Sequence, residues 1–377
     1  MLTVTERIAK LSGFSPATVS RVLNNVGPVS ETTRRAILEA VAASGTVPKL
    51  RGPRKNAKAK AGNGSPRPQG LIDVVMVRQG PVEWELRKDD GRVTTVPASK
   101  PAPRDYFSPQ NRYASSYFRA LGESVIEEVQ RCGYRAVMQI TNQLPGRLQP
   151  DGGSAGMILL GNQIPEVADF IDSQSFPIVS LIAAPRPYKA DFVGIDNVAG
   201  IAEAFDHLYG LGHRKIGFIS GSRVTRRNVF YERYLAYRMK LSEAGLAVRE
   251  DWMFFGSCNF PEDQVACEAI LRQPDRPTAL ICGYDGIALA AKMAADAVGL
   301  RVPDDLSITG FDDQELAGLS NPPLTTLRTP TQEMGRYAVQ LLMMRLRGTG
   351  VASEHTGIRF TPRLIVRQTT AAPPAVG

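Results

Sequence analysis

The stretch that decides the N-terminal fold reads Phe14-Ser-Pro-Ala-Thr-Val-Ser-Arg-Val-Leu-Asn-Asn25. Ser15 is a good helix N-cap, and Pro16 suits the first helical position because its missing N–H costs nothing there. Apolar residues then recur at helical spacing on one face, at Val19, Val22 and Leu23. The other face carries hydroxyls, an amide and a guanidinium, from Thr18, Ser20, Arg21 and Asn24. Such groups contact phosphates, and an arginine can make two hydrogen bonds to a guanine edge. An ordinary amphipathic surface helix fits the same pattern, so the flanking sequence has to decide.

Both flanks favour a DNA-reading unit. Residues 3–12 read as a capped helix with Val4, Ile8 and Leu11 facing inward, and Gly13 ends it. Residues 30–44 read as a third helix that stops at Gly45. Two short helices joined by a glycine-containing turn and braced by a third form a helix-turn-helix unit, whose second helix enters the major groove.

These residues resemble the lac-repressor (LacI/GalR) family of bacterial transcriptional regulators. That family opens with a pattern like T-I-x-D-V-A-x-x-A-G-V-S-x-x-T-V-S-R-V-L-N, and the matching segments here are Thr3-Val4, Ile8-Ala9, Gly13-Phe14-Ser15 and Thr18-Val-Ser-Arg-Val-Leu-Asn24. The resemblance implies that Pro16, Ala17 and Arg21 read bases, and that Thr18, Ser20 and Asn24 contact the DNA backbone. We also assign Thr5, Ser15 and Asn25 to the DNA-binding set.

Charge is concentrated at the same end of the chain. Residues 1–70 hold twelve Lys and Arg against three Asp and Glu, a net charge of +9, whereas the whole chain of 377 residues carries +8. A basic arm could serve solubility alone, but its position beside the helix-turn-helix favours attraction to a polyanion. No run approaches the ~18 apolar residues that a membrane span needs. The four cysteines show no metal spacing, and the start lacks signal-peptide architecture, so we expect free thiols, no metal, no cofactor and a cytoplasmic location.

Residues 49–70 read as a flexible basic linker rich in Pro and Gly. The family resemblance implies P-N-x-x-A-R-x-L here, a short hinge helix whose Leu wedges into the minor groove. This chain instead has Gly52, Pro53 and Lys55 where the family has Ala, Arg and Leu. Because glycine and proline oppose a helix and lysine cannot act as an apolar wedge, we expect the hinge kink to be missing.

From Leu71 the pattern changes to strands alternating with helices, which indicates parallel sheets covered by helices. The predicted strands are 71–77, 135–140, 155–160, 177–182, 215–220, 252–255, 279–282, 306–310 and 364–367. The predicted helices are 113–132, 165–173, 198–211, 228–244, 261–271, 286–298 and 332–346. The pattern is long enough for two lobes, and ligands in such folds bind beyond the carboxyl ends of the strands.

Two irregularities interrupt the first lobe. Residues 82–96 look like a β-hairpin turning at Asp89-Asp90-Gly91, inserted where relatives have a short loop. Residues 142–154 are too short and too rich in Pro and Gly for the helix that relatives carry there, so we expect that helix to be absent.

The family's periplasmic-binding-protein-like core is matched by four segments: Gly194-Ile-Asp-Asn-Val-Ala-Gly200, Leu211-Gly-His-Arg-Lys-Ile-Gly-Phe-Ile-Ser-Gly221, Arg301-Val-Pro-Asp-Asp-Leu-Ser-Ile-Thr-Gly-Phe-Asp-Asp313 and Pro322-Pro-Leu-Thr-Thr326. In the effector pocket that this resemblance implies, Arg233 and Asp312 match family positions. A guanidinium and a carboxylate can fork onto vicinal hydroxyls or a carboxylate. A surface or inter-lobe ion pair is the competing interpretation.

Other pocket positions depart from the family. Tyr284 stands where an Asn usually precedes Asp285, and the ligand-stacking aromatic falls at Asn259, beside Phe260. The Asp that often ends the strand at 177–182 is replaced by the apolar run 181–184. Because each hydroxyl of a sugar needs a polar partner, this pocket suits a less polar metabolite, or it is degenerate.

We therefore predict an α/β fold with an N-terminal all-α domain at 1–48, a linker at 49–70 and a two-lobed ligand-sensing and dimerising core at 71–377. Lobe 1 covers approximately 71–193 and 329–347, and lobe 2 covers approximately 194–328 and 357–368. The predicted function is a homodimeric regulator, a repressor by family analogy, that binds a near-palindromic operator under the control of a small-molecule effector. An effector-independent or architectural DNA-binding regulator stays open. A solute-binding protein would need export, and an enzyme lacks a catalytic set, since no Walker loop, H-E-x-x-H or CxxC occurs.

Overall fold

The computed structural model forms two compact units, residues Met1–Arg67 and Pro68–Gly377, which we describe separately. The structure describes residues 4–23, 29–43, 70–77, 84–89, 92–97, 112–141, 154–161, 170–171, 176–182, 190–220, 229–256, 260–348 and 355–374.

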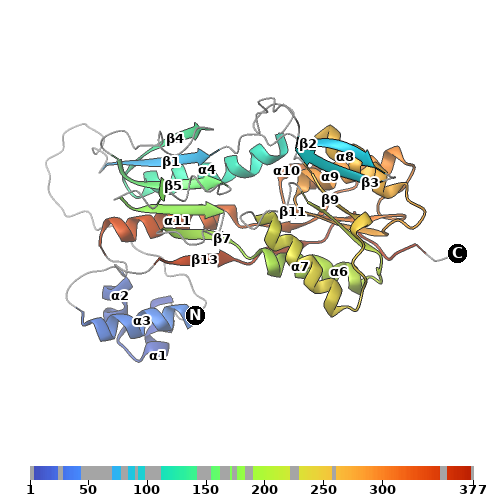
Figure 1. Ribbon diagram of the computed structural model, residues 1–377. Helices are drawn as coiled ribbons and strands as arrows, with labels where there is room; N and C mark the ends of the chain where they lie inside the picture. The colour runs from blue at the N-terminus through green and yellow to red at the C-terminus, as the bar shows by residue number, and fades with distance from the viewer. Residues whose placement is uncertain are drawn as a thin grey trace. The chain divides into compact units, whose positions relative to one another are not determined.

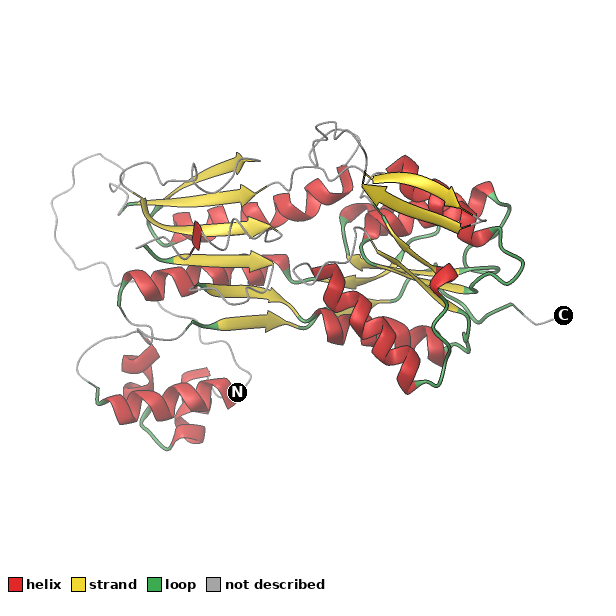
Figure 2. Cartoon of the chain, in the orientation of Figure 1, coloured by secondary structure: helices red, strands yellow, loops and turns green. Residues whose placement is uncertain are grey.

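The described part of the first unit is entirely helical (Figure 2), with α1 (Val4–Ser12), α2 (Pro16–Leu23) and α3 (Glu31–Ala43). Ile8, Val19 and Ile37, one from each helix, are fully buried against one another and form its core. The three predicted helices are therefore confirmed. One inward residue was wrong: Leu11 is 57% exposed, because α1 needs only a narrow apolar stripe to cover two short helices.

The second unit contains two six-stranded sheets (Figure 1). The first sheet is parallel throughout, in the order β13 (Gly357–Phe360), β7 (Asp191–Ile195), β6 (Ile178–Ile182), β5 (Ser154–Gly161), β1 (Leu71–Val77) and β4 (Arg135–Thr141). Two helices, α4 (Arg112–Arg131) and α11 (Thr331–Leu346), pack against it and against each other.

The second sheet repeats this arrangement. Its order is β14 (Arg363–Ile365), β12 (Thr325–Arg328), β11 (Ser307–Asp312), β10 (Ala279–Cys282), β8 (Ile216–Ser220) and β9 (Met253–Phe255), with β14 alone antiparallel. The helices around it are α6 (Asn197–Gly210), α7 (Val229–Glu243), α8 (Phe260–Leu271), α9 (Asp285–Ala297) and the short α10 (Glu315–Leu319), with a 3₁₀ turn at Glu250–Trp252.

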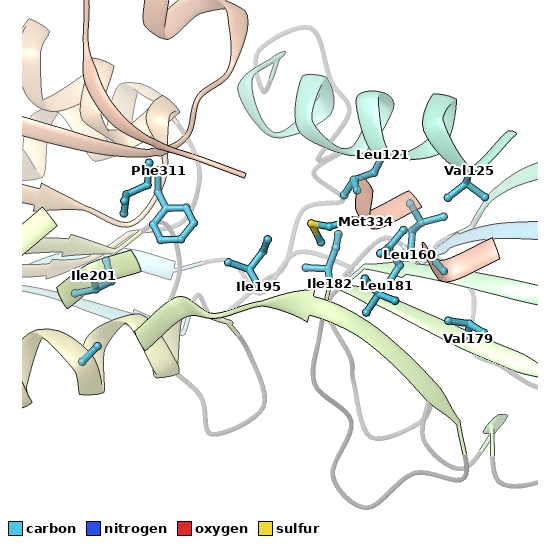
Figure 3. Packing of buried hydrophobic residues seen from close by; sticks show 14 of the residues in the cluster. Leu121, Val125, Leu160, Val179, Leu181, Ile182, Ile195, Ile201, Phe311 and Met334 are labelled. Carbon is cyan, nitrogen blue, oxygen red and sulfur yellow. The ribbon is translucent and has the colours of Figure 1, made fainter. Parts of the chain in front are cut away.

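Alternation along the strands sends side chains to opposite faces of the second sheet. Phe218 and Ile281 belong to one buried cluster, whereas their neighbours Ile219 and Leu280 belong to another. The first of these clusters continues into the first sheet. Figure 3 shows Phe311 on the side of the second sheet, with Ile182 and the other labelled residues of the first sheet beyond Ile195. The two lobes therefore share one apolar core.

The chain passes between the two sheets three times in its described part, after β7, after β12 and after β13. This corrects our assignment of residues 357–368 to lobe 2. β13 pairs with β7 and so extends the first sheet, whereas β14 pairs with β12 in the second. The other predicted domain boundaries stay predictions.

The hairpin insertion is confirmed in its backbone: β2 (Trp84–Asp89) pairs antiparallel with β3 (Arg92–Pro97), with Asp89 opposite Arg92. Several other expectations lie outside the described residues, namely the linker at 49–69, the absent helix at 142–153 and most of the helix at 165–173.

Candidate functional site

The start of α2 follows from local capping. Ser15 Oγ accepts a hydrogen bond from the backbone N–H of Thr18 at 3.1 Å, and it lies 2.9 Å from Thr18 Oγ1. Pro16 is the first helical residue. The helix begins where the sequence predicted, so its direction and its exposed face are fixed by that cap.

The outer face of α2 carries the residues predicted to read DNA. Val19 and Val22 are buried, which turns Pro16, Ala17 and Arg21 outward into exposed positions. Four of the predicted residues are also accessible: Ser15 is exposed, and Thr5, Thr18 and Ser20 are half-buried. Asn24 and Asn25 lie outside the described residues. The described members of the set therefore share the accessible side of one small helical unit.

The second candidate site lies at the carboxyl end of β11, where Arg233 from α7 meets Asp312. Arg233 Nη2 lies 3.8 Å from Asp312 Oδ1, and their side chains are 6% and 9% exposed. Asp312 is the last residue of β11 and has a φ of 105°, a conformation that a non-glycine residue adopts only at a cost. The backbone at the end of β11 is therefore strained, and this strained conformation sets the direction of the Asp312 side chain.

Arg233 is held on several sides. Its Nε donates to Asn197 Oδ1 at 2.8 Å, and its Nη1 donates to the carbonyl of Gly283. Its guanidinium carbon lies 3.5 Å from the ring centroid of Phe311. Burial lowers the pKa of Arg233, and the charge of Asp312 opposes that shift. The guanidinium is therefore held in place through Nε and Nη1, and Nη2 is the nitrogen that faces Asp312.

A chain of polar contacts fixes Arg233 from behind. Asn197, which is 1% exposed, donates through Nδ2 to Glu232 Oε2 at 2.8 Å. Glu232 in turn accepts two bonds from Arg359 of β13, at 3.0 and 3.1 Å. Because Arg359 belongs to the first sheet, this network also ties the two sheets together.

The carboxyl of Asp312 is strongly perturbed by its surroundings. Burial raises its pKa to about 7, and the charge of Arg233 only partly offsets this effect. Its Oδ1 has no hydrogen-bond partner in the structure. Tyr117 of α4 faces the pair: burial raises the pKa of its phenol, the charge of Asp312 raises it further, and Arg233 opposes the shift.

The other predicted pocket residues have different surroundings. Asp285 is 1% exposed, and both of its oxygens accept bonds from the protein, from Gln314 N at 2.7 Å and from the hydroxyl of Thr326. Burial raises the pKa of Asp285, with the charge of Asp312 adding to the shift. Tyr284 is buried edge-on against Phe230, with ring centroids 6.3 Å apart. An effector-binding role for these two residues stays a prediction.

Asn259 lies outside the described residues, and Phe260 begins α8, with only its backbone described. The first sheet offers an apolar counterpart to Asp312. Ile182 ends β6, the strand equivalent to β11 in the sheet order, with a φ of 98°. Leu181 and Ile182, the described part of the apolar run 181–184, are both buried.

Sequence reasoning missed Tyr117, Asn197 and Gln314. Asn197 stands inside a quoted family segment, so that segment was the available signal. Tyr117 and Gln314 lie almost 200 positions apart in the chain, and no local pattern pairs them. Asp313, the neighbour of Asp312, accepts bonds from Arg328 and Arg367 at 2.6 Å each, which is a structural ion pair.

His213 has the structural role expected of it: its ring nitrogens lie 2.9 Å from Thr278 Oγ1 and 3.0 Å from Ser307 Oγ. No cluster of three His, Cys, Asp or Glu side chains that could hold a metal occurs in the described part of the chain. Within the same residues, no helix combines the length and apolarity that crossing a membrane requires.

Two families match this chain. Residues 6–49 match "Bacterial regulatory proteins, lacI family", and residues 205–370 match "Periplasmic binding protein-like domain". The chain is 34% identical over 221 residues to the HTH-type transcriptional repressor CytR of Escherichia coli, a match that spans 58% of this chain and 63% of that protein. It is 29% identical over 385 residues to the HTH-type transcriptional regulator MalR of Streptomyces coelicolor, covering 97% and 96% of the two chains.

Solved structures agree on the fold. The transcriptional regulator CelR in its cellobiose complex aligns with a TM-score of 0.65 at 24% identity, over 98% of this chain and 100% of that one. The lac repressor dimer bound to operator and the anti-inducer ONPF aligns with a TM-score of 0.64 at 21% identity, over 98% and 99%.

Fold and site together define a protein that joins a helix-turn-helix unit to a periplasmic-binding-protein-like unit of two parallel sheets. Residues 6–49 carry the helix-turn-helix domain of the LacI family of bacterial regulatory proteins, residues 205–370 carry a periplasmic binding protein-like domain, and the similar proteins are transcriptional regulators of this kind. The resemblance inferred from the sequence and the predicted fold class are both confirmed.

Proposed function

We propose that this protein is a sequence-specific transcriptional regulator, a repressor, whose affinity for operator DNA is modulated by a small molecule bound between its two lobes. The observation that carries the proposal is the capped helix α2, which presents Arg21 and its neighbours outward from a unit that matches the family's DNA-binding domain. In this role Thr5, Ser15 to Thr18, Ser20, Arg21, Asn24 and Asn25 contact DNA.

We place the effector at Arg233 and Asp312. Arg233 Nη2 and Asp312 Oδ1 offer a donor next to an acceptor, which fits a molecule with adjacent polar groups. The apolar side chain of Ile182 at the end of β6 supports the view that the effector is less polar than a simple sugar. Tyr284, Asp285, Asn259 and Phe260 belong to the same proposed pocket.

The protein acts as a homodimer in the bacterial cytoplasm in this proposal. Paired reading heads suit a near-palindromic operator, since a two-fold axis in the protein is then matched by one in the DNA. The neighbouring lac repressor structure, a dimer on operator, supports this arrangement by analogy of fold. Catalysis has no part in the proposal.

Selection of tight-binding sites from a random duplex pool tests the DNA half. Full-length protein at physiological salt should enrich a near-palindrome, and binding without enrichment would leave only non-specific attraction to phosphates. A thermal-shift screen of metabolites tests the effector half. Stabilisation by simple hexoses and pentoses alone would contradict the less polar effector.

An effector-independent regulator is the second candidate. It is favoured by the extent to which Arg233 is already satisfied by Asn197, Gly283 and Phe311. A compound from the screen that changes affinity for the selected operator would exclude it.

A further inference from the structure

Helix α4 of the first lobe contacts the second lobe through two adjacent residues, Ser116 and Tyr117. Ser116 Oγ donates to Oε1 of Gln314, which follows β11. The phenol of Tyr117, the next residue, interacts with the side chain of Thr329, which follows β12. Thr329 lies in the connection between β12 and α11, whereas Ser116 and Gln314 lie on none of the three covalent connections between the sheets. The Ser116–Gln314 bond therefore constrains the lobes independently of those connections.

Gln314 is rigidly placed on its own side. Its backbone N–H donates to Asp285 Oδ2 at 2.7 Å, and the whole residue is only 8% exposed. Thr329 is equally fixed, since it is 5% exposed and its Oγ1 donates to the carbonyl of Asp312 at 3.4 Å. Ser116 and Tyr117 therefore contact two buried residues of the second lobe, and each of these residues is held by a further hydrogen bond.

The amide of Gln314 has a second, unused half. Its Oε1 accepts the bond from Ser116, whereas its buried Nε2 has no hydrogen-bond partner in the structure. A buried donor without a partner is unfavourable, and a molecule that accepts from it would relieve that cost. Asp312 Oδ1, two residues earlier, is also without a hydrogen-bond partner. The two groups thus border the proposed effector site together.

We propose that Ser116 and Gln314, with Tyr117 and Thr329 beside them, form an inter-lobe latch that holds the lobes in the arrangement seen here. Through its amide nitrogen Nε2, Gln314 links this latch to a molecule bound at Arg233 and Asp312; this clause rests on the proposed function. A molecule that accepts from Nε2 strengthens the latch, because hydrogen bonds on one amide polarise each other. A molecule that donates to Oε1 competes with Ser116 and releases it.

Hydrogen bonds of this kind are individually weak. They matter because alternative lobe arrangements in hinged proteins differ by little, so one or two bonds change their populations. The shared apolar core and the Arg359–Glu232 ion pair lie near the covalent connections. The Ser116–Gln314 bond, in contrast, joins the N-terminal part of α4 to the loop after β11.

Inter-lobe distance in the free full-length protein tests the latch. Spin labels at Glu127→Cys on α4 and Arg272→Cys after α8, both exposed positions, report the distance by double electron–electron resonance. The background carries Cys132→Ser and Cys258→Ser, since Cys267 and Cys282 are fully buried. Ser116→Ala and Gln314→Met should each broaden the distribution and shift it to longer distances. Ser116→Thr, which keeps the hydroxyl, should retain the wild-type distribution.

Ser242→Ala, on the exposed face of α7, is the matched control and should change nothing. Circular dichroism and melting curves verify that each variant folds. Wild-type distributions in both Ser116→Ala and Gln314→Met would overturn the latch, and so would a Ser116→Thr distribution as broad as that of Ser116→Ala. The measurement uses neither DNA nor an added compound. Its outcome is therefore independent of whether the chain regulates transcription.

Discussion

The side chains of Arg233 and Asp312 lie 3.8 Å apart at the carboxyl end of β11, close enough for charge attraction but too far for a hydrogen bond. Both side chains are almost fully buried. The ion pair therefore compensates only part of the cost of removing the carboxylate from water, and this is why burial dominates the pKa of Asp312.

The first prediction concerns pH. The folded pKa of Asp312 is raised to about 7, whereas an unfolded aspartate titrates near 3.9. The folded carboxyl keeps its proton where the unfolded one has lost it, so this group's contribution to stability falls as pH rises from about 4 to about 7. The Asp312→Asn variant does not lose stability in this way, because an asparagine side chain does not titrate. Urea unfolding should show the variant gaining stability relative to wild type across that window. A pH-independent difference would contradict the assignment.

The second prediction is that Asn197 stabilises the proposed effector site by bonding to both Arg233 and Glu232. Asn197→Ala removes the acceptor of Arg233 Nε and the donor to Glu232, leaving buried polar groups without partners. We expect a loss of about 1–3 kcal/mol in the free energy of unfolding. The exposed Gln130→Ala on α4 is the control and should change little. Equal effects of the two substitutions would show that the network is not needed.

Acid should weaken the second lobe through His213. Burial lowers the pKa of the His213 ring. The ring therefore stays neutral in the folded state at pH values where the unfolded chain, with a histidine pKa of about 6.5, already binds a proton. The stability it contributes is complete above that pH and is lost as pH falls below it. In urea unfolding, the advantage of wild type over His213→Gln should therefore shrink on acidification. An advantage that stays constant down to pH ~5 would contradict this account.

Much of this fold could be read from periodicity. The long described helices and most strands of the second unit follow the predicted alternation, because buried parallel strands are continuous apolar runs, whereas the short α10 was not predicted. The strands that were missed are β7, β12 and β13. They are four or five residues long, and β12 is half threonine while β13 alternates exposed and half-buried positions. Such strands form because they pair with neighbouring strands in the folded sheet, and no local sequence pattern predicts them.

The candidate site divides in the same way. Arg233 and Asp312 were found because they stand in motifs that resemble the family's, and the structure brings them together. Ser116 and Gln314 meet across 198 positions of sequence, through the placement of one lobe against the other. A contact of that range has no trace in composition or spacing. The same applies to the strained φ of Ile182 and Asp312, which only the backbone reveals.

The error at Leu11 leads to a direct comparison. Ile8 is fully buried in the core of the first unit, whereas Leu11 on the same helix is 57% exposed. Ile8→Ala should cost about 2–5 kcal/mol, because it opens a cavity among three small helices, and Leu11→Ala should cost little. Amide hydrogen exchange of α1 to α3 in the full-length chain measures both. Similar protection in the two variants would mean that this core is not organised around Ile8.

The sharpest test of DNA reading compares Arg21 with a cation on the neighbouring helix. Arg21 and Lys10 are both exposed, on α2 and α1 respectively. If Arg21 forks onto a base edge, Arg21→Ala should reduce discrimination between the selected operator and a scrambled duplex by about 1–3 kcal/mol. Lys10→Ala removes the same charge but should weaken binding to both duplexes equally, since phosphate contacts carry no sequence information. Fluorescence anisotropy at two salt concentrations separates the terms. If Arg21→Ala weakened both duplexes alike, Arg21 would be a phosphate contact, and base reading would have to be assigned to other residues of α2.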